Sequence, residues 1–325
     1  MGTFSSGLPV LLFLPFGGVF MVMTLPKLTK LYGTDEDCRE ILTRLRWPEG
    51  VTCPRCKNRN VWYVESRKQF TCSECSYQFS VTTGTIFNDS HLPLTTWFMA
   101  VLLLVEARKG ISANQVKRTL GVSYKTAWYL CHRVRAAMRE AEKPMLGGVI
   151  EMDETYVGGK VKGHGIQAGK DNKQVVIGIR QRDGEVRFFH AANAKASTLA
   201  HFIRENVSED VDVIITDDFM SYPYAMNRAG VDPAKHKTVN HSGHVYVDGE
   251  IHTNTVENAF SLLKRGIMGT WHRVSAKHLA AYLEEMCFRF NRRKRADLFI
   301  DTLRHMVTAP VLTFEKLTAD KFRVA

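Results

Sequence analysis

Apolar residues follow a helical pattern at 34–50 and 93–142, and from residue 149 the pattern changes to strands until helices dominate from 254. Residues 34–50 predict a short helix in which Thr34 is the N-cap ahead of Asp35 and Glu36. Residues 51–83 alternate short strands with cysteine-containing turns, and residues 93–142 have a helical pattern throughout. The first half of the chain therefore predicts a small cysteine-rich module followed by a helical region.

A linker with Pro144, Gly147 and Gly148 separates this region from the strand-rich half. Asp183-Gly184 is typical of a turn between two strands, and Ser197 is expected to cap a helix. Three strands, a helix, another strand and then helices favour a mixed α/β sheet. The expected elements are strands at 149–157, 174–180, 185–190 and 211–216, a helix at 197–206, and helices from 254 onward.

The apolar stretch 8–23 needs a separate interpretation. It contains Pro9, Pro15, Gly17 and Gly18, and no Lys or Arg precedes it. A signal peptide has a basic start, and a membrane-spanning helix needs roughly 20 unbroken apolar residues. We expect neither. Our interpretation is that translation starts at Met21 or Met23 and that the upstream residues are a mis-assigned or disordered extension. No other segment is expected to span a membrane.

Two Cys-x-x-Cys turns supply a candidate metal site. Cys53 and Cys56 are separated by 15 residues from Cys72 and Cys75. This spacing is typical of four thiolates that hold one structural Zn²⁺ tetrahedrally. The segment is too small for a core of its own, so the metal would supply its folding energy. Nearby Arg and Lys residues favour phosphate contact by this zinc ribbon, although such a ribbon can also simply brace a neighbour.

Residues 111–139 predict two helices joined by a tight turn at Gly121. Ser112 and Ser123 stand at the two helix starts, and Val116, Leu120, Val122, Ala127 and Leu130 have the spacing of a buried seam. A helix-turn-helix places its second helix in the major groove of DNA, with the first residues of that helix on base edges. An ordinary helical hairpin is the alternative. The candidate DNA-binding residues here are Lys125, Thr126, Tyr129 and Arg133.

Composition agrees with a nucleic-acid partner. The 325 residues carry a formal net charge of +11, which favours a polyanion. Hydrophobic residues make up 45% of the chain, enough for sizeable cores. Of the seven cysteines, Cys38, Cys131 and Cys287 stand alone and are interpreted as buried thiols of a reduced, cytosolic protein.

Three acidic residues have settings that indicate metal chemistry. Asp153 interrupts the first strand of the expected sheet, and Asp217 lies just past the end of another. Functional groups in open α/β sheets are placed at such strand ends. Glu257 starts a helix, although the spacing of Asn254 and Glu257 also fits a simple capping box. Together the three carboxylates suit two Mg²⁺ ions about 3.5–4 Å apart that stabilise phosphoryl transfer. Lys264 lies seven residues, close to two helical turns, beyond Glu257 and is expected on the same face.

These motifs resemble the insertion-sequence transposases that carry an N-terminal zinc ribbon and a DDE catalytic domain. The resemblance covers roughly residues 34–295 and rests on the segments 153–160, 216–217, 252–257, 262–266 and 290–293. It implies a ribonuclease H-like catalytic fold, Mg²⁺ or Mn²⁺ as catalytic ions, and action on the terminal inverted repeats of the element. Asp153 and Asp217 match the two aspartates of the family. The third ligand is Glu257 or, alternatively, Asn254. Asp218 stands where the family pattern has Gly, which leaves the choice between Asp217 and Asp218 open.

The expected architecture is multidomain α+β: a zinc ribbon, a helix-turn-helix and a ribonuclease H-like α/β catalytic domain. Its divisions are an apolar extension (1–33), the ribbon with its leading helix (34–90), the helix-turn-helix (91–145), the catalytic domain (146–300) and a C-terminal tail (301–325).

The expected partners are double-stranded DNA and further copies of the chain in a dimer or larger synaptic complex. Lys160, within a basic loop that extends to residue 173, and Arg265 are further candidate DNA contacts. The alternatives are a catalytically silent DNA-binding regulator and a nuclease that cuts without joining. His236, His241, His244 and His252 are spaced irregularly, so at most one or two are expected near the active site.

Overall fold

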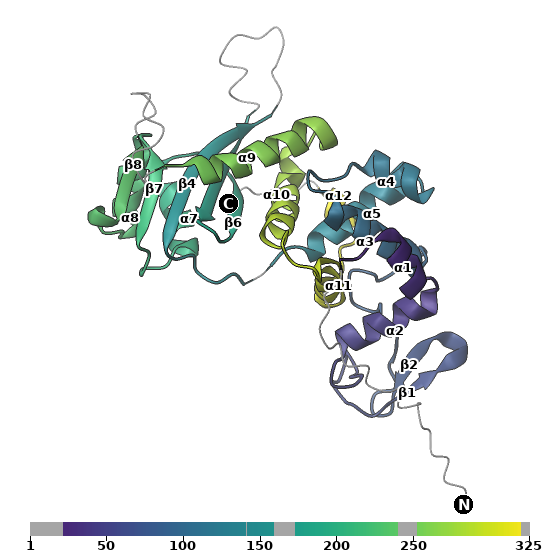
Figure 1. The fold of residues 1–325 in the computed structure, drawn as a ribbon. Helices are drawn as coiled ribbons and strands as arrows, with labels where there is room; N and C mark the ends of the chain where they lie inside the picture. The colour runs from purple at the N-terminus through teal and green to yellow at the C-terminus, as the bar shows by residue number, and fades with distance from the viewer. Residues whose placement is uncertain (1–21, 141, 159–172, 240–251, 320–325) are drawn as a thin grey trace, which may run out of the picture.

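The computed structural model describes residues 22–140, 142–158, 173–239 and 252–319. In this part of the chain a small three-stranded module, a helical region and a five-stranded sheet flanked by helices follow one another (Figure 1). The architecture is α+β, as the sequence predicts. Within the described ranges no helix combines the length and hydrophobicity that crossing a membrane needs.

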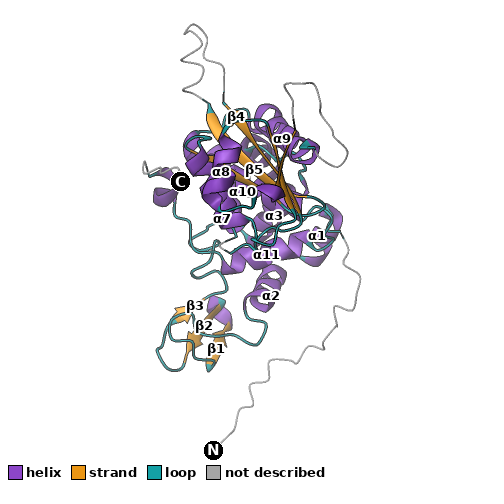
Figure 2. Ribbon diagram, turned by 90° about the vertical axis from the view of Figure 1, so that its left-hand side faces the viewer, coloured by secondary structure: helices purple, strands orange, loops and turns teal. Residues whose placement is uncertain are grey.

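The N-terminal module is built on helix α2 (Asp35–Arg46) and an antiparallel sheet of β1 (Val61–Val64), β2 (Gln69–Cys72) and β3 (Gln78–Phe79). A short 3-10 helix, η1 (Glu65–Arg67), joins β1 to β2. Thr34 caps α2 and forms a reciprocal capping box with Asp37, which confirms the predicted helix start. The sheet lies apart from the larger one (Figure 2).

The helical region has a core of its own. It combines α1 (Leu25–Leu31), α3 (Leu94–Glu106), α4 (Ala113–Leu120) and α5 (Tyr124–Ala137) with the buried face of α2 and with α11 (Leu298–Thr308) from the end of the chain. Trp97, Phe98, Leu104, Val134 and Leu303 are among its buried residues. A further short helix, α12 (Phe314–Thr318), follows.

Two of the expected terminal segments differ from the structure. Residues 25–31, inside the expected extension, form α1, whose Leu28 is buried. Residues 298–308 form α11, which crosses the expected boundary at residue 300 and buries Leu303, Met306 and Val307. The sequence did not indicate that these residues join the helical core, because α1 packs on α3, and α11 packs on α2, α3 and α5.

The large sheet contains β4 (Val149–Val157), β5 (Gln174–Gln181), β6 (Val186–Ala191), β7 (Val213–Asp217) and β8 (His236–Val239). Its order is β6-β5-β4-β7-β8. The first three strands are antiparallel neighbours, and β7 and β8 run parallel to β4. This mixed sheet is consistent with the ribonuclease H-like domain that the sequence predicts.

Helices cover both faces of this sheet. Helices α7 (Ala196–Asn206) and α8 (Ser221–Ala229) cover one face, and α9 (Asn254–Gly266) and α10 (Ala276–Asn291) cover the other. Even-numbered residues of β4 such as Ile150 and Met152 point to the α7 side, which follows from the two-residue period of a strand. A 3-10 turn, η2 (Pro233–Lys235), precedes β8, and a π-helical turn, η4 (Ile267–Trp271), follows α9.

Several element boundaries differ from the predicted ones. The helix expected to be capped by Ser197 begins at Ala196, and its N-cap is Lys195. The capping box considered for Asn254 and Glu257 is wrong, because the N-cap is Thr253, whose side chain makes no cap hydrogen bond. Strand β8 was not predicted, because its sequence His236–Val239 has a single buried residue and depends on pairing with β7.

Candidate active site and metal centres

Two parallel strands bring the predicted aspartates together. Residue 151 of β4 pairs with residue 215 of β7, so Asp153 and Asp217 lie two residues further along neighbouring strands. Carboxylate oxygens of Asp153, Glu154 and Asp217 all lie within 4.8 Å of one another. Three carboxylates this close repel one another unless a cation lies between them. The donor set is all oxygen, which suits Mg²⁺ or Mn²⁺.

The electrostatics of the cluster agree with this need for a cation. Burial, followed by the neighbouring charges of Asp217 and Glu154, raises the pKa of Asp153 to about 7. Burial also raises the pKa of Glu154. The carboxylates are therefore held in a setting that disfavours their own charge, and a bound divalent cation would reverse that preference.

Glu154 was not predicted as part of the site. Alternation along a strand places Asp153 and Glu154 on opposite faces, which hides their proximity in the sequence. The Tyr222 hydroxyl, on α8, donates a hydrogen bond of 2.8 Å to Glu154 and holds its carboxylate on the α8 side. The only available signal was its position directly after Asp153.

Glu257 lies on α9, near the cluster but outside the group of three carboxylates within 4.8 Å among the described residues. Its charge contributes to the raised pKa of Asp153. The Thr253 hydroxyl donates a hydrogen bond of 2.8 Å to Glu257, so the residue before the helix orients the acid one turn later. Asn254, the alternative ligand, lines a cavity among arginines of β5 and α10.

Glu151 fixes the start of α9 and was missed at the sequence level. Its carboxylate is fully buried and accepts hydrogen bonds from the backbone N–H groups of Thr255 (2.9 Å) and Val256 (3.0 Å). It also pairs with Arg182 at 2.8 Å. A carboxylate at a helix N-terminus satisfies amides that otherwise have no partner. Glu151 therefore holds α9 against β4, two residues before Asp153.

Gly178 lets α9 approach the sheet at the same level. It pairs with Asp153 across β4 and β5. A Cβ atom at this position would lie 2.6 Å from the Phe260 ring and 3.1 Å from Val256. A larger residue would push α9, and Glu257 with it, away from the aspartates.

The remaining predicted residues of α9 lie at its far end. Lys264 and Arg265 are exposed in the last turn of the helix, and neither forms an ion pair with another residue that the structure describes. The sequence correctly predicted that they belong to the helix of Glu257. Contact of Lys264 and Arg265 with DNA stays a prediction.

Four cysteines of the N-terminal module form the predicted cluster. Cys53 Sγ lies 3.7 Å from Cys75 Sγ, and Cys56 Sγ lies 3.5 Å from Cys72 Sγ. Four sulfurs at a Zn–S distance of about 2.3 Å in a tetrahedron are separated by roughly 3.8 Å. The donor set and its spacing therefore fit a structural Zn²⁺.

The four candidate DNA-binding residues of α5 surround one hollow of about 320 Å³, which Phe314 also lines. Ser123 caps α5, and Gly121 adopts the left-handed turn after α4, as predicted. Lys125 lies 4.7 Å from the centre of the Phe314 ring, and Tyr129 donates to the Leu312 carbonyl at 2.6 Å.

Arg133 differs from the other three. It is only 3% exposed and donates to the Asn88 carbonyl at 2.5 Å. It lies between the rings of Trp97 and Tyr129. Its visible role is therefore to support the helix, and base contact by these four residues stays a prediction.

Of the four histidines considered in the sequence, the structure describes two. His252 lies 3.4 Å from Glu151, and His236 hydrogen bonds with the Thr216 hydroxyl, next to Asp217, at 2.9 Å. Lys160, His241 and His244 lie outside the described residues, as does most of the basic loop.

Comparisons with known proteins agree with this geometry. Residues 145–291 match the ISXO2-like transposase domain, and residues 33–78 match the transposase zinc-ribbon domain. The chain is 30% identical over 274 residues, 78% of its length and 90% of the relative's, to an uncharacterized protein in transposable element ISH50 of Halobacterium salinarum.

The fold and the carboxylate cluster thus define a protein of the DDE transposase class. More particularly, the chain belongs to the ISXO2-like transposases with an N-terminal zinc ribbon. The family implies DNA binding and transposition.

Proposed function

We propose that the chain cleaves DNA at the terminal inverted repeats of an insertion sequence and joins the released ends to target DNA. The observation that carries this proposal is the convergence of Asp153 and Asp217, from two neighbouring strands, beside Glu257 on α9. Two divalent ions, when bound, would supply charge stabilisation at the attacking and leaving oxygens of the phosphate. Asp153, Asp217 and Glu257 would hold them.

The protein groups around these carboxylates have positioning roles in this proposal. Tyr222 orients Glu154, and Thr253 orients Glu257. Glu151 and Gly178 fix the separation between α9 and the sheet. The zinc ribbon and helices α4 and α5 would bind and position the element ends. Joining two ends favours a dimer or a larger synaptic complex.

The test is a strand-transfer assay with Mg²⁺, a DNA fragment that carries the terminal repeats and a target plasmid. The wild type should give both nicked and joined products. Asp153→Asn and Asp217→Asn should each bind the fragment normally and lose cleavage. Asp212→Asn, an exposed acid just before β7, and Asp218→Asn should keep cleavage and serve as matched controls. Cleavage within tenfold of wild type in either aspartate variant would overturn the two-metal assignment.

The third ligand is tested in the same assay. We expect Glu257→Gln to abolish cleavage, because a neutral amide binds Mg²⁺ far more weakly than a carboxylate. Asn254→Ser should reduce activity only modestly. The reverse pattern would assign the ligand to Asn254. Binding without any Mg²⁺-dependent cut in the wild type would identify a silent regulator, and cuts without joined product would identify a nuclease.

A further inference from the structure

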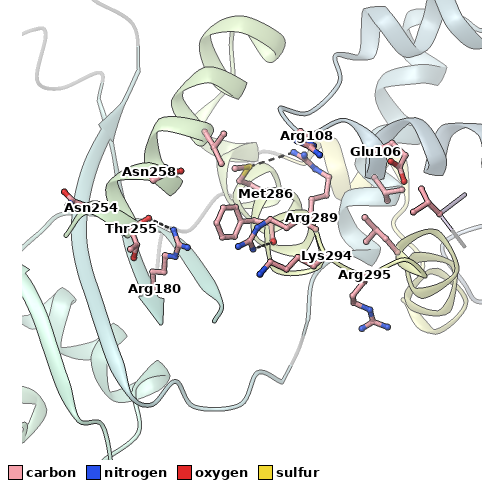
Figure 3. A pocket seen from close by; sticks show the side chains of 16 residues that line it. Glu106, Arg108, Arg180, Asn254, Thr255, Asn258, Met286, Arg289, Lys294 and Arg295 are labelled. Carbon is pink, nitrogen blue, oxygen red and sulfur yellow. Dashed lines mark hydrogen bonds between the residues drawn. The ribbon is translucent and has the colours of Figure 1, made fainter. Parts of the chain in front are cut away.

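A basic cavity shares strand β5 and helix α9 with the surroundings of the candidate active site. Its volume is about 910 Å³, and it is lined by side chains of β5, α9 and α10 and of the residues at the end of α3 (Figure 3). Its basic lining residues are Arg108, Arg180, Arg289, Arg293, Lys294 and Arg295. Glu106 is the one acidic side chain among the described residues that line it. We call this feature the arginine cavity.

Two guanidinium groups in the arginine cavity pack against one aromatic ring. The guanidinium carbons of Arg180 and Arg293 lie 5.0 Å and 4.0 Å from the centre of the same ring, Phe290. Burial, and then the charge of Arg293, lowers the pKa of Arg180, and the charges of Glu151 and Asp183 offset this only in part. Among the described residues, neither Arg180 nor Arg293 has an ion-pair partner within 4.0 Å, and the same holds for Arg108 and Lys294. Arg180 is half-buried and Arg293 is exposed at the mouth of the cavity. Two cations that act on each other favour an anion nearby.

The polar groups of the cavity are already oriented. Arg180 donates to the backbone carbonyl of Thr255, and Arg293 donates to the carbonyl of Phe290 at 2.6 Å. Arg180 Nε and Thr255 Oγ1 are buried, and neither has a hydrogen-bond partner within the described parts of the chain. Asn254 and Asn258 add amide groups to the same wall. Guanidinium, hydroxyl and amide donors together are the set that contacts phosphate oxygens of nucleic acids.

The cavity and the carboxylates share two elements. Asp153 pairs with Gly178, and Arg180 lies two residues further along β5, roughly 7 Å along the strand. On α9, Glu257 acts on Asp153, and the next residue, Asn258, lines the cavity. A DNA strand with one phosphate at the carboxylates could therefore place a nearby phosphate of the same strand at Arg180.

We propose that the arginine cavity binds the sugar-phosphate backbone of the DNA strand that is cut, within a few nucleotides of the phosphate at the carboxylates, through Arg180 and Arg293. This inference rests on the proposed function for the identity of the strand. Its role is to fix the register of that strand independently of base sequence. The cavity also connects the sheet to the end of α3, so DNA bound there touches both the catalytic and the helical parts.

The test measures the affinity of the full-length protein for the repeat fragment as a function of salt, in an Asp153→Asn background so that no cleavage occurs. One phosphate contact contributes a slope of about −0.9 in log K against log salt. Arg180→Gln should therefore weaken binding roughly tenfold at about 0.1 M salt and reduce the slope by about one contact. The double variant Arg180→Gln/Arg293→Gln should make the salt slope shallower by the equivalent of about two phosphate contacts.

Two controls separate phosphate binding from structural damage and from net charge. Arg228→Gln removes one charge from an exposed position on α8, across the sheet, and should leave the slope unchanged. Arg180→Lys keeps the charge and should restore most of the affinity that Arg180→Gln loses. An unchanged slope in the double variant, with folding intact, would overturn the proposal. A loss of slope in Arg228→Gln as large as that in Arg180→Gln would also overturn the proposal.

A free anion is the other source of the same chemistry. If inorganic phosphate raises the melting temperature of the wild type but not of Arg180→Gln, while DNA affinity is equal in both, the cavity is a small-anion site and the proposal fails. The outcome is also separable from the proposed function. A wild type that cleaves and joins while the double variant binds DNA normally would refute the cavity alone. If the wild type never cleaves DNA, but Arg180→Gln still weakens DNA binding, the catalytic proposal alone is refuted.

Discussion

Asp153 shows how far a single residue could be predicted. An acid that interrupts an apolar strand is costly to bury. Its position indicated a function only together with Asp217 at the end of a neighbouring strand and Glu257 at a helix start. Glu154 and Glu151 could not be predicted in the same way. Their roles depend on partners far along the chain, Tyr222 for one and the start of α9 for the other. Sequence spacing carries no signal for such contacts.

The raised pKa of Asp153 predicts a stability that depends on pH when no Mg²⁺ or Mn²⁺ is present. An unfolded Asp has a pKa of about 3.9, and the folded value is about 7. Between these values the folded chain binds more protons than the unfolded chain, so the free energy of unfolding falls as pH rises through this window. Asp153→Asn removes the penalty and keeps an oxygen that can accept the backbone N–H of Glu154.

We therefore expect Asp153→Asn to be more stable than the wild type at pH 8, by on the order of 1–4 kcal/mol, and equally stable near pH 4. Urea unfolding measures the difference. Chelator is left out of the buffer because it would remove the structural zinc. Added Mg²⁺ should stabilise the wild type at pH 8 and leave the variant unchanged. Equal pH profiles for the two proteins would show that the carboxylates do not destabilise the fold.

At the level of elements, the zinc ribbon was the most predictable part of the chain. Its four ligands stand in two local turns, so spacing alone defines the cluster. Helix α9 was predicted less accurately, because its start depends on Thr253 and on the buried Glu151 rather than on Asn254. Helix α11 lies where helices were expected, but its packing into the helical core was not, because its apolar face meets α2, α3 and α5.

The ribbon predicts a metal dependence of its own. Besides the metal cluster it has a small core, which includes Phe79, Phe70 and Trp47, so the thiolates must contribute much of its stability. One Zn²⁺ per chain should copurify with the wild type, and Cys72→Ser should lose it. Cys131→Ala, a buried thiol in α5, should retain full zinc and is the matched control. Elemental analysis of the purified proteins measures this. A wild type without zinc would exclude the ribbon's structural metal.

At the scale of the whole molecule, the sequence indicated three parts but not how they are joined. The helical region and the sheet meet where α5 lies against α10. Glu285 of α10 is fully buried and accepts a hydrogen bond of 2.5 Å from Arg135 of α5. Arg289 lies 3.1 Å from the same carboxylate and donates to the Ala107 carbonyl at the end of α3. One carboxylate thus neutralises two buried cations that come from both parts.

This arrangement predicts a large difference between two adjacent acids. Glu285→Gln leaves Arg135 and Arg289 buried without a counter-charge, and breaking a buried pair in this way costs about 3–5 kcal/mol. Glu284→Gln removes the next carboxylate, which pairs with Lys143 at 2.9 Å and is 24% exposed. A pair this close to solvent contributes at most about 1 kcal/mol. Urea unfolding of both variants should therefore show a loss for Glu285→Gln several times that for Glu284→Gln.

The Glu285→Gln variant should also loosen the connection between the two parts before either one unfolds. The linker around Pro144 and Gly147 joins α5 to β4, so protease cleavage there under native conditions should be faster than in the wild type or in Glu284→Gln. Equal losses of stability in the two variants, with equal cleavage of the linker, would mean that the α5–α10 contact is held by its apolar neighbours and not by this carboxylate.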